Sequence, residues 1–282
     1  MGSSLNSVFC ILYSVFFLPM HPAVSADRPL IFAHRGGAGL APENTLPAFD
    51  QGLALGADGL ELDVHLSRDG VPVVHHDALL DRTTDAVGPI CERTVQELAR
   101  VNACAGFARS GRVWDGGPAG VPTLQEVLRT YRDTRLIIEL KGPSSVLARA
   151  VVQTVREADA IDRTCIGGFS WRALRAVRQY EPRLATSASK PEVRVALYAS
   201  RLGVSVRPGT YVAFQVPERA GLTRVVSPQF IRLAHAVSLA VQVWTVDEPD
   251  DVSRLLDWGA DAIITDRPDV AVPILRDRVQ QG

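Results

Sequence analysis

Three carboxylates stand inside apolar, strand-like runs of this sequence, where a charge is costly to bury without a counter-charge. Glu61 and Asp63 lie two residues apart in one run, and Glu139 lies in another. Because side chains two residues apart on a strand share a face, Glu61 and Asp63 point the same way. Convergence on one hard cation, Mg²⁺ or Ca²⁺, accounts for this pattern. A cluster of ion pairs with Arg35 and Lys141 accounts for it too.

Histidines follow two of the apolar runs. His34 ends the first run, and His75 and His76 end a short run after the turn "RDG". Histidine titrates near working pH, so His34 and His76 are candidate proton-transfer groups. His75 and His76 have opposite parity, so only one of them points toward a site. His65 shares the face of the carboxylates, and we interpret it as a support behind the site.

Two basic residues complete the chemistry that these side chains indicate. Arg35 and Lys141 supply the fixed positive charge that a phosphate needs. A cation, two histidines and two basic side chains together indicate hydrolysis of a phosphoryl group. The glycines at 36, 37 and 39 form no GxGxxG fingerprint, which disfavours a dinucleotide site. We expect these glycines to keep Cβ atoms away from a charged ligand.

The elements that must position these residues alternate between strand-like runs and amphipathic, helix-like segments. Eight alternations predict a (βα)8 TIM barrel, whose active site lies at the carboxyl ends of the strands. A doubly wound open sheet is the alternative on pattern alone. The segment at about 83–122 has weak periodicity, and we interpret it as a small insertion after the second strand. The expected strands cover 30–34, 59–65, 135–141, 164–169, 183–188, 210–216, 240–246 and 261–266, with a short extra strand at 71–76.

Composition limits the remaining possibilities. The 282 residues carry a formal net charge of -1, which gives no support for nucleic-acid binding. Cys91, Cys104 and Cys165 lack metal-type spacing, and we expect them to be small buried hydrophobes. The length and composition allow one large domain or two small ones, and we place a single domain at 27–282.

The first 26 residues resemble a signal peptide. The apolar run at 8–20 is too short to span a bilayer comfortably, so no stable membrane insertion is expected. Val24 and Ala26 suit the small-residue rule for cleavage, whereas the segment before the run has no Lys or Arg. The alternatives are therefore a signal peptide at 1–26, with export to the periplasm or medium, and a spurious N-terminal extension on a cytoplasmic protein.

Motifs along residues 30–270 resemble those of the glycerophosphodiester phosphodiesterase family. Their order and spacing match over nearly the whole predicted domain. The matching segments are "HRG" (34–36), "APENT" (41–45), "GADGLELDVHLSRDGVPVVHHDALLDRTT" (56–84), "VPTL" (121–124), "IELK" (138–141), "VWTV" (243–246) and "GADAIITDRPD" (259–269). The departures are minor: "HHD" stands where an apolar residue often precedes "HD", and Asp follows "WTV" where Asn is frequent.

The resemblance implies a (βα)8 barrel, a small-molecule glycerophosphodiester substrate and a divalent cation, Mg²⁺ or Ca²⁺. It implies that the second catalytic histidine directly precedes an Asp, which selects His76 over His75. It also places Glu43 beside the site and lets Asn44 or Thr45 cap the first helix. By residue, it assigns acid/base roles to His34 and His76, metal ligation to Glu61, Asp63 and Glu139, phosphate binding to Arg35 and Lys141, and the glycerol wall to Trp244.

The same resemblance implies a reaction in which a glycerol hydroxyl of the substrate attacks first, and water then opens the cyclic phosphate. The products are sn-glycerol 3-phosphate and an alcohol. The nearest rival is a lysophospholipase D, which needs an apolar entrance that the insertion is expected to provide. A non-catalytic phosphodiester-binding barrel predicts loss of a histidine or a carboxylate, and the sequence retains them all. Oligomeric state has no signature in the sequence.

Overall fold

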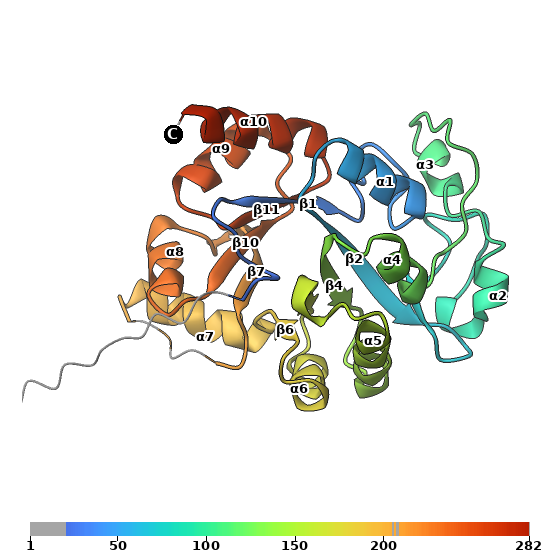
Figure 1. Cartoon of the computed structure of the whole chain (residues 1–282), viewed down its shortest axis with the longest axis horizontal. Helices are drawn as coiled ribbons and strands as arrows, with labels where there is room; N and C mark the ends of the chain where they lie inside the picture. The colour runs from blue at the N-terminus through green and yellow to red at the C-terminus, as the bar shows by residue number, and fades with distance from the viewer. Residues whose placement is uncertain (1–20, 205, 207–208, 282) are drawn as a thin grey trace, which may run out of the picture.

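The computed structural model describes residues 21–204, 206 and 209–281, and its centre is a barrel of parallel strands (Figure 1). Seven of the eight neighbouring strand pairs form ladders. A single parallel bridge between Ser187 and Ala213 links the remaining pair. The predicted (βα)8 barrel is therefore confirmed. In chain order its strands are β1 (Leu30–His34), β2 (Gly59–Leu66), β4 (Arg135–Leu140), β5 (Thr164–Gly167), β6 (Ala185–Thr186), β7 (Ala213–Pro217), β10 (Ala240–Trp244) and β11 (Ala262–Thr265).

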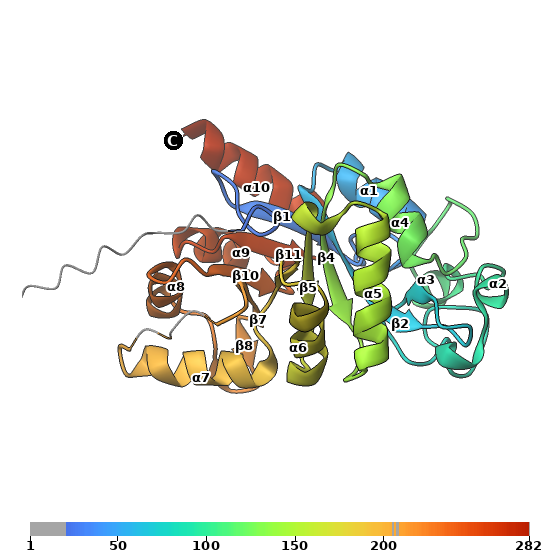
Figure 2. The ribbon, with the colours of Figure 1, turned by 60° about the horizontal axis from the view of Figure 1, so that its bottom comes forward.

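Helices surround the barrel (Figure 2), and their apolar residues pack on those of the strands. In α5, Leu147, Val151 and Val155 are buried at four-residue spacing, and the side chain of Ser144 caps the first turn. Each main helix follows a barrel strand, so each begins near the carboxyl end of that strand. These helices are α1 (Leu46–Ala54), α4 (Leu124–Thr130), α5 (Ser145–Glu157), α6 (Trp171–Tyr180), α7 (Lys190–Arg201), α8 (Pro228–His235), α9 (Pro249–Asp257) and α10 (Pro268–Gln281).

The segment after β2 begins with β3 (Pro72–Val74), which pairs antiparallel with β2. Three short helical turns follow: η1 (Ile90–Glu92), α2 (Val95–Leu98) and α3 (Ala105–Arg109). This segment lies at the outer side of the barrel beyond β2 and α1 (Figures 1 and 2). A separate apolar cluster holds it together, with Leu80, Ile90 and Leu98 fully enclosed.

The cysteine prediction is wrong at one position. Cys104 and Cys165 are buried, whereas Cys91 is exposed. Cys91 lies in η1, and its neighbour Ile90 takes the place in the apolar cluster. One turn of helix can bury only one of two adjacent side chains here, and the chain buries the larger apolar one.

Strand β6 is much shorter than the predicted range of 183–188. It pairs over Ala185 and Thr186 alone. Arg178 forms hydrogen bonds at the end of the strand. Its guanidinium donates to Thr186 Oγ1 at 2.8 Å and to the Ser187 carbonyl at 2.9 Å. Ser189 then caps α7 through a capping box. A small hairpin of β8 (Arg219–Ala220) and β9 (Thr223–Arg224) was not predicted.

Residues before β1 close the amino end of the barrel. Ala23 and Val24 are fully buried, and they pack with residues at or next to the start of four strands: Cys165, Ala185, Ala213 and Ala240. Most of the predicted leader, 1–20, lies outside the described residues. In the part of the chain that the structure describes, no helix is both long and apolar enough to cross a membrane.

Candidate active site

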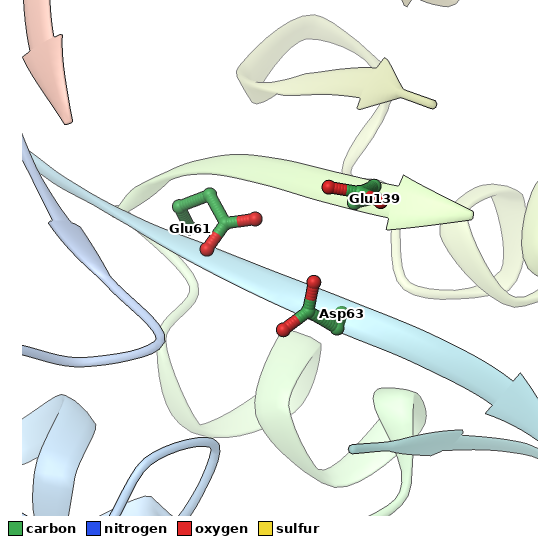
Figure 3. Close-up of side chains that lie close together, drawn as sticks. All are labelled: Glu61, Asp63 and Glu139. Atoms are coloured by element: carbon green, nitrogen blue, oxygen red, sulfur yellow. The ribbon is translucent and has the colours of Figure 1, made fainter. Parts of the chain in front are cut away.

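The three carboxylates meet because of strand register. Asp63 on β2 pairs with Glu139 on β4, and Glu61 precedes Asp63 by two residues on the same face. Figure 3 shows Glu61 and Asp63 on β2 beside Glu139 on the neighbouring strand. Each of the three offers one oxygen, and these oxygens lie within 4.8 Å of one another. This cluster of acidic residues is able to bind a metal ion.

Two of the three carboxylates of this cluster are buried, so their negative charges need positive charge nearby to be stable. Glu61 and Asp63 are 5% and 1% exposed. Burial, followed by the negative charge of Asp63, raises the pKa of Glu61 to about 8. Asp63 Oδ1 is buried and accepts no well-aligned hydrogen bond, although Lys141 Nζ lies 2.8 Å from it. Because three carboxylate oxygens converge and the negative charge of the buried Glu61 is incompletely compensated, the residues fit a hard divalent ion.

The basic residues predicted to grip phosphate also contact these carboxylates. Lys141 Nζ donates to Glu139 Oε1 at 2.8 Å, and Arg35 Nε lies 3.3 Å from Asp63 Oδ2. Burial would raise the pKa of Asp63, but the charges of Lys141 and Arg35 outweigh it and lower that pKa. The ion-pair cluster and the candidate metal site therefore share the same residues. Both Arg35 and Lys141 also line the cavity described below.

His34 lies at the carboxyl end of β1, opposite Glu61 in the ladder with β2. Its Nδ1 donates to Asp266 Oδ1 at 2.6 Å, and its Nε2 lies 3.8 Å from Glu61 Oε2. Burial favours a lower pKa for His34, but Glu61 and Asp266 together raise it. Asp266 therefore fixes the ring and leaves Nε2 beside Glu61.

His76 has the same arrangement with a different carboxylate. Its Nδ1 donates to Asp77 Oδ1 at 2.6 Å, and Arg82 Nε donates to the other oxygen of Asp77. His75 is buried and turned away, since its Nε2 lies 2.9 Å from Thr83 Oγ1. His65 Nε2 lies 3.0 Å from the carbonyl of His76, so it supports the loop as interpreted.

The glycines of the loop after β1 were expected to keep Cβ atoms away from a charged ligand, but they serve the packing of the loop instead. Gly36 has φ +89°, and a Cβ there would lie 2.8 Å from the backbone of Ala48 in α1. Gly39 similarly faces the carbonyl of Asp266, and neither glycine lines the cavity. The glycines thus allow the loop to pack closely on α1 and on the end of β11. Thr45, not Asn44, caps α1, because its side chain accepts from the Ala48 N–H.

A cavity of about 670 Å³ opens over these side chains at the carboxyl ends of the strands. His34, His76, Glu61 and Glu139 line it, whereas Asp63 lies beneath them. Trp244, the predicted glycerol wall, also lines it and meets Phe169 edge to face with ring centroids 6.0 Å apart. The cavity brings seven of the eight predicted site residues to one surface.

Three polar residues take part that were not assigned site roles from the sequence. Asp266 and Asp77 hold the two histidines, and Asn44 Nδ2 donates to Asp63 Oδ2 at 2.8 Å. Asn44 has φ +59°, a conformation that asparagine tolerates better than most residues. Asp266 directly follows the barrel strand β11, and this position at a strand end is the sequence feature that could have identified it as a site residue. Glu43 is adjacent to the site as expected, because it bridges Arg35 and Arg82.

A (βα)8 barrel with a carboxylate cluster and two carboxylate-held histidines at its carboxyl end has the groups that a hydrolytic enzyme of phosphate esters uses. The model of the glycerophosphoryl diester phosphodiesterase family matches residues 34–270. This chain belongs to that family, and it is an enzyme that hydrolyses phosphoric diesters.

Relatives of this chain agree with the assignment. A glycerophosphodiester phosphodiesterase of Bacillus altitudinis is 32% identical over 258 residues, covering 86% of this chain and 97% of the relative. The crystal structure of the Agrobacterium tumefaciens glycerophosphodiester phosphodiesterase is 27% identical, with a TM-score of 0.69 over 87% of this chain and 99% of that one. A phosphodiesterase from Oleispira antarctica, solved with the product sn-glycerol-3-phosphate, is 25% identical, with a TM-score of 0.71 over 88% and 97%.

Proposed function

We propose that this enzyme hydrolyses glycerophosphodiesters to sn-glycerol 3-phosphate and an alcohol, and that it depends on Mg²⁺ or Ca²⁺. The observation that carries the proposal is the pair of histidines. Each has Nδ1 held by a carboxylate, and each lines the same cavity as the acidic cluster. The relative from Oleispira antarctica with bound sn-glycerol-3-phosphate supports the glycerol phosphate product.

The candidate ligands of the cation are Glu61, Asp63 and Glu139. When bound there, a divalent cation would supply positive charge to the phosphate and to the charge that develops on it. Arg35 and Lys141 line the same space and add positive charge of their own. The electrostatic task of these residues is to offset a dianionic transition state in a site partly closed to water.

The histidines carry the proton transfers in this proposal. One imidazole accepts a proton from the attacking hydroxyl, and the other donates a proton to the departing alcohol oxygen. Asp266 and Asp77 each fix the tautomer by accepting from Nδ1, which leaves Nε2 to exchange the proton. The attacking group is a glycerol hydroxyl of the substrate in the first step, and water opens the cyclic phosphate in the second.

The experiment is phosphorus NMR of glycerophosphocholine incubated with the enzyme and Mg²⁺ or Ca²⁺. The proposal predicts glycerol 3-phosphate as the product and no phosphocholine, because the bond to the alcohol breaks. The same assay with EDTA should show no turnover. Phosphocholine as the product, or no metal-dependent turnover of any glycerophosphodiester, would overturn it.

A lysophosphatidylcholine arm of the same experiment separates the lysophospholipase D alternative. The apolar entrance that this alternative needs was expected from the segment 83–122. No residue of that segment lines the cavity in the part of the chain that the structure describes. We therefore expect glycerophosphocholine to be the better substrate. Faster release of lysophosphatidic acid than of glycerol 3-phosphate would reverse that ranking.

A further inference from the structure

The cavity continues from the carboxylates to one face of α7. Its volume of about 670 Å³ lies in the range that encloses a drug-sized ligand, so it has room beyond a glycerol phosphate group. The α7 side chains that line it recur every three to four residues and therefore form one stripe along the helix. This α7 stripe consists of Lys190, Val193, Arg194, Leu197 and Tyr198.

The two cations of the α7 stripe lack carboxylate partners. Among the described residues, no carboxylate oxygen lies within 4.0 Å of the charged groups of Lys190 or Arg194, and both residues are exposed. The neighbouring acid Glu192 is already paired with Arg178 at 2.8 Å. By contrast, the cations at the other end of the cavity, Arg35 and Lys141, contact carboxylates.

The lining charges of the cavity are therefore balanced at the barrel end and unbalanced on α7. At the barrel end the carboxylates Glu61 and Glu139 stand beside Arg35 and Lys141, whereas the positive charges on α7 have no carboxylate of the described residues beside them. Apolar side chains lie along the same cavity, including Phe169 and Leu197. An apolar wall lowers the local dielectric and strengthens the pull of Lys190 and Arg194 on an anion.

We propose that Lys190 and Arg194 bind an anionic group, a carboxylate or a phosphate, on the alcohol half of the diester. This inference rests on the proposed function and specifies its substrate class. The enzyme then prefers glycerophosphodiesters whose alcohol carries a negative charge. It disfavours choline, whose quaternary ammonium meets two like charges.

The test compares substrates that differ in charge and little in size. The anionic probe is the glycerol 3-phosphate diester of 3-hydroxypropionate, and the neutral probe is the diester of 3-hydroxypropionamide. Wild-type enzyme should show a higher kcat/KM for the anionic probe, by roughly 3- to 10-fold, as expected for two solvent-exposed charge pairs. This preference should shrink as salt is added, because exposed charges are screened.

The Lys190→Gln/Arg194→Gln variant should bring the ratio of the two kcat/KM values close to one. The matched control is Arg129→Gln/Arg132→Gln, which removes two exposed positive charges on and just after α4, away from the cavity. The control should keep the wild-type ratio.

Turnover of both probes with no preference in the wild-type enzyme would overturn the α7 assignment and leave the proposed function standing. So would equal loss of the preference in the control variant. Absence of metal-dependent turnover of both probes and of glycerophosphocholine would instead overturn the proposed function itself.

Discussion

Each catalytic histidine of the proposed reaction has a carboxylate on Nδ1, and the two carboxylates come from different parts of the chain. Asp266 is 232 residues from His34 in sequence, whereas Asp77 is the next residue after His76. A carboxylate on Nδ1 fixes the tautomer and the ring plane. The histidines therefore differ in how their partners are held, since Arg82 also clamps Asp77.

Replacing His34 or His76 with Gln should lower kcat on glycerophosphocholine by roughly 10²–10⁴-fold, the usual contribution of a general acid or base. A coupled assay for glycerol 3-phosphate measures this loss. His75→Gln is the matched control, because His75 is turned away from the cavity and should change kcat far less. Near-wild-type rates for His34→Gln or His76→Gln would remove that residue from the proton transfers.

Asp266 is a positioning residue in this account, and its variants should separate that role from a structural one. Asp266→Asn should lower kcat by roughly 10–100-fold, as for other groups that orient a histidine, with little change in KM. Asp266→Glu should restore part of kcat, because its carboxylate can still accept from His34 Nδ1. A rise in KM with unchanged kcat, or a fall in kcat matched by a fall in melting temperature, would contradict positioning.

The site residues that could be predicted from the sequence are those placed by the alternation of side chains along a strand or by the end of a strand. Glu61 and Asp63 follow from a two-residue spacing, and His34 follows from the end of an apolar run. The Asp266–His34 contact could not be predicted in this way. It depends on β11 lying beside β1, a pairing that follows from closure of the whole barrel and from no spacing within one run.

At the scale of elements, register places the site. The β1–β2 ladder sets His34 opposite Glu61, and the β2–β4 ladder sets Asp63 opposite Glu139. A slip of one residue in either ladder would turn a whole row of side chains to the other face. The loop after β1 must then approach α1 closely, and Gly36 permits that approach.

Gly36→Ala should therefore destabilise the fold by about 2–4 kcal/mol, from a positive φ and a contact of 2.8 Å with the backbone of Ala48. Gly70→Ala is the control, because Gly70 also has a positive φ but nothing lies within 4 Å of a Cβ there. It should cost only about 1–2 kcal/mol. Urea unfolding measures both. Equal losses for the two variants would show that packing of the β1 loop on α1 contributes nothing.

The lengths of the elements were less predictable than their order. The apolar run at 183–188 predicts a strand of six residues, yet β6 pairs over two. Arg178, from the preceding helix, donates to the Ser187 carbonyl, a backbone group that a longer ladder would otherwise pair. The amphipathic pattern of α5 needed no such partner, because its apolar residues Leu147, Val151 and Val155 are buried along the whole helix.

At the scale of the whole molecule, the barrel is closed at one end and open at the other. Ala23 and Val24 cover the amino ends of β5, β6, β7 and β10, while the site cavity opens at the carboxyl ends. Cleavage after Ala26 would remove this cover from the barrel.

A chain that begins at Asp27 should accordingly be less stable than one that begins at His21. The expected loss is about 2 kcal/mol, the scale of burying one valine side chain and its neighbour. Urea denaturation of the two chains, under matched conditions, measures the difference. Identical midpoints and slopes would show that the segment 21–26 does not stabilise the barrel.

The central claim is that Glu61, Asp63 and Glu139 hold a divalent cation on which diester hydrolysis depends. The most direct measurement is glycerol 3-phosphate release from glycerophosphocholine by enzyme stripped with EDTA, then supplied with Mg²⁺ or Ca²⁺. The account predicts no turnover after stripping, full recovery with one of the two ions, and no recovery in Glu61→Gln at the same ion concentration. Undiminished turnover in excess EDTA, or full recovery of Glu61→Gln, would contradict it.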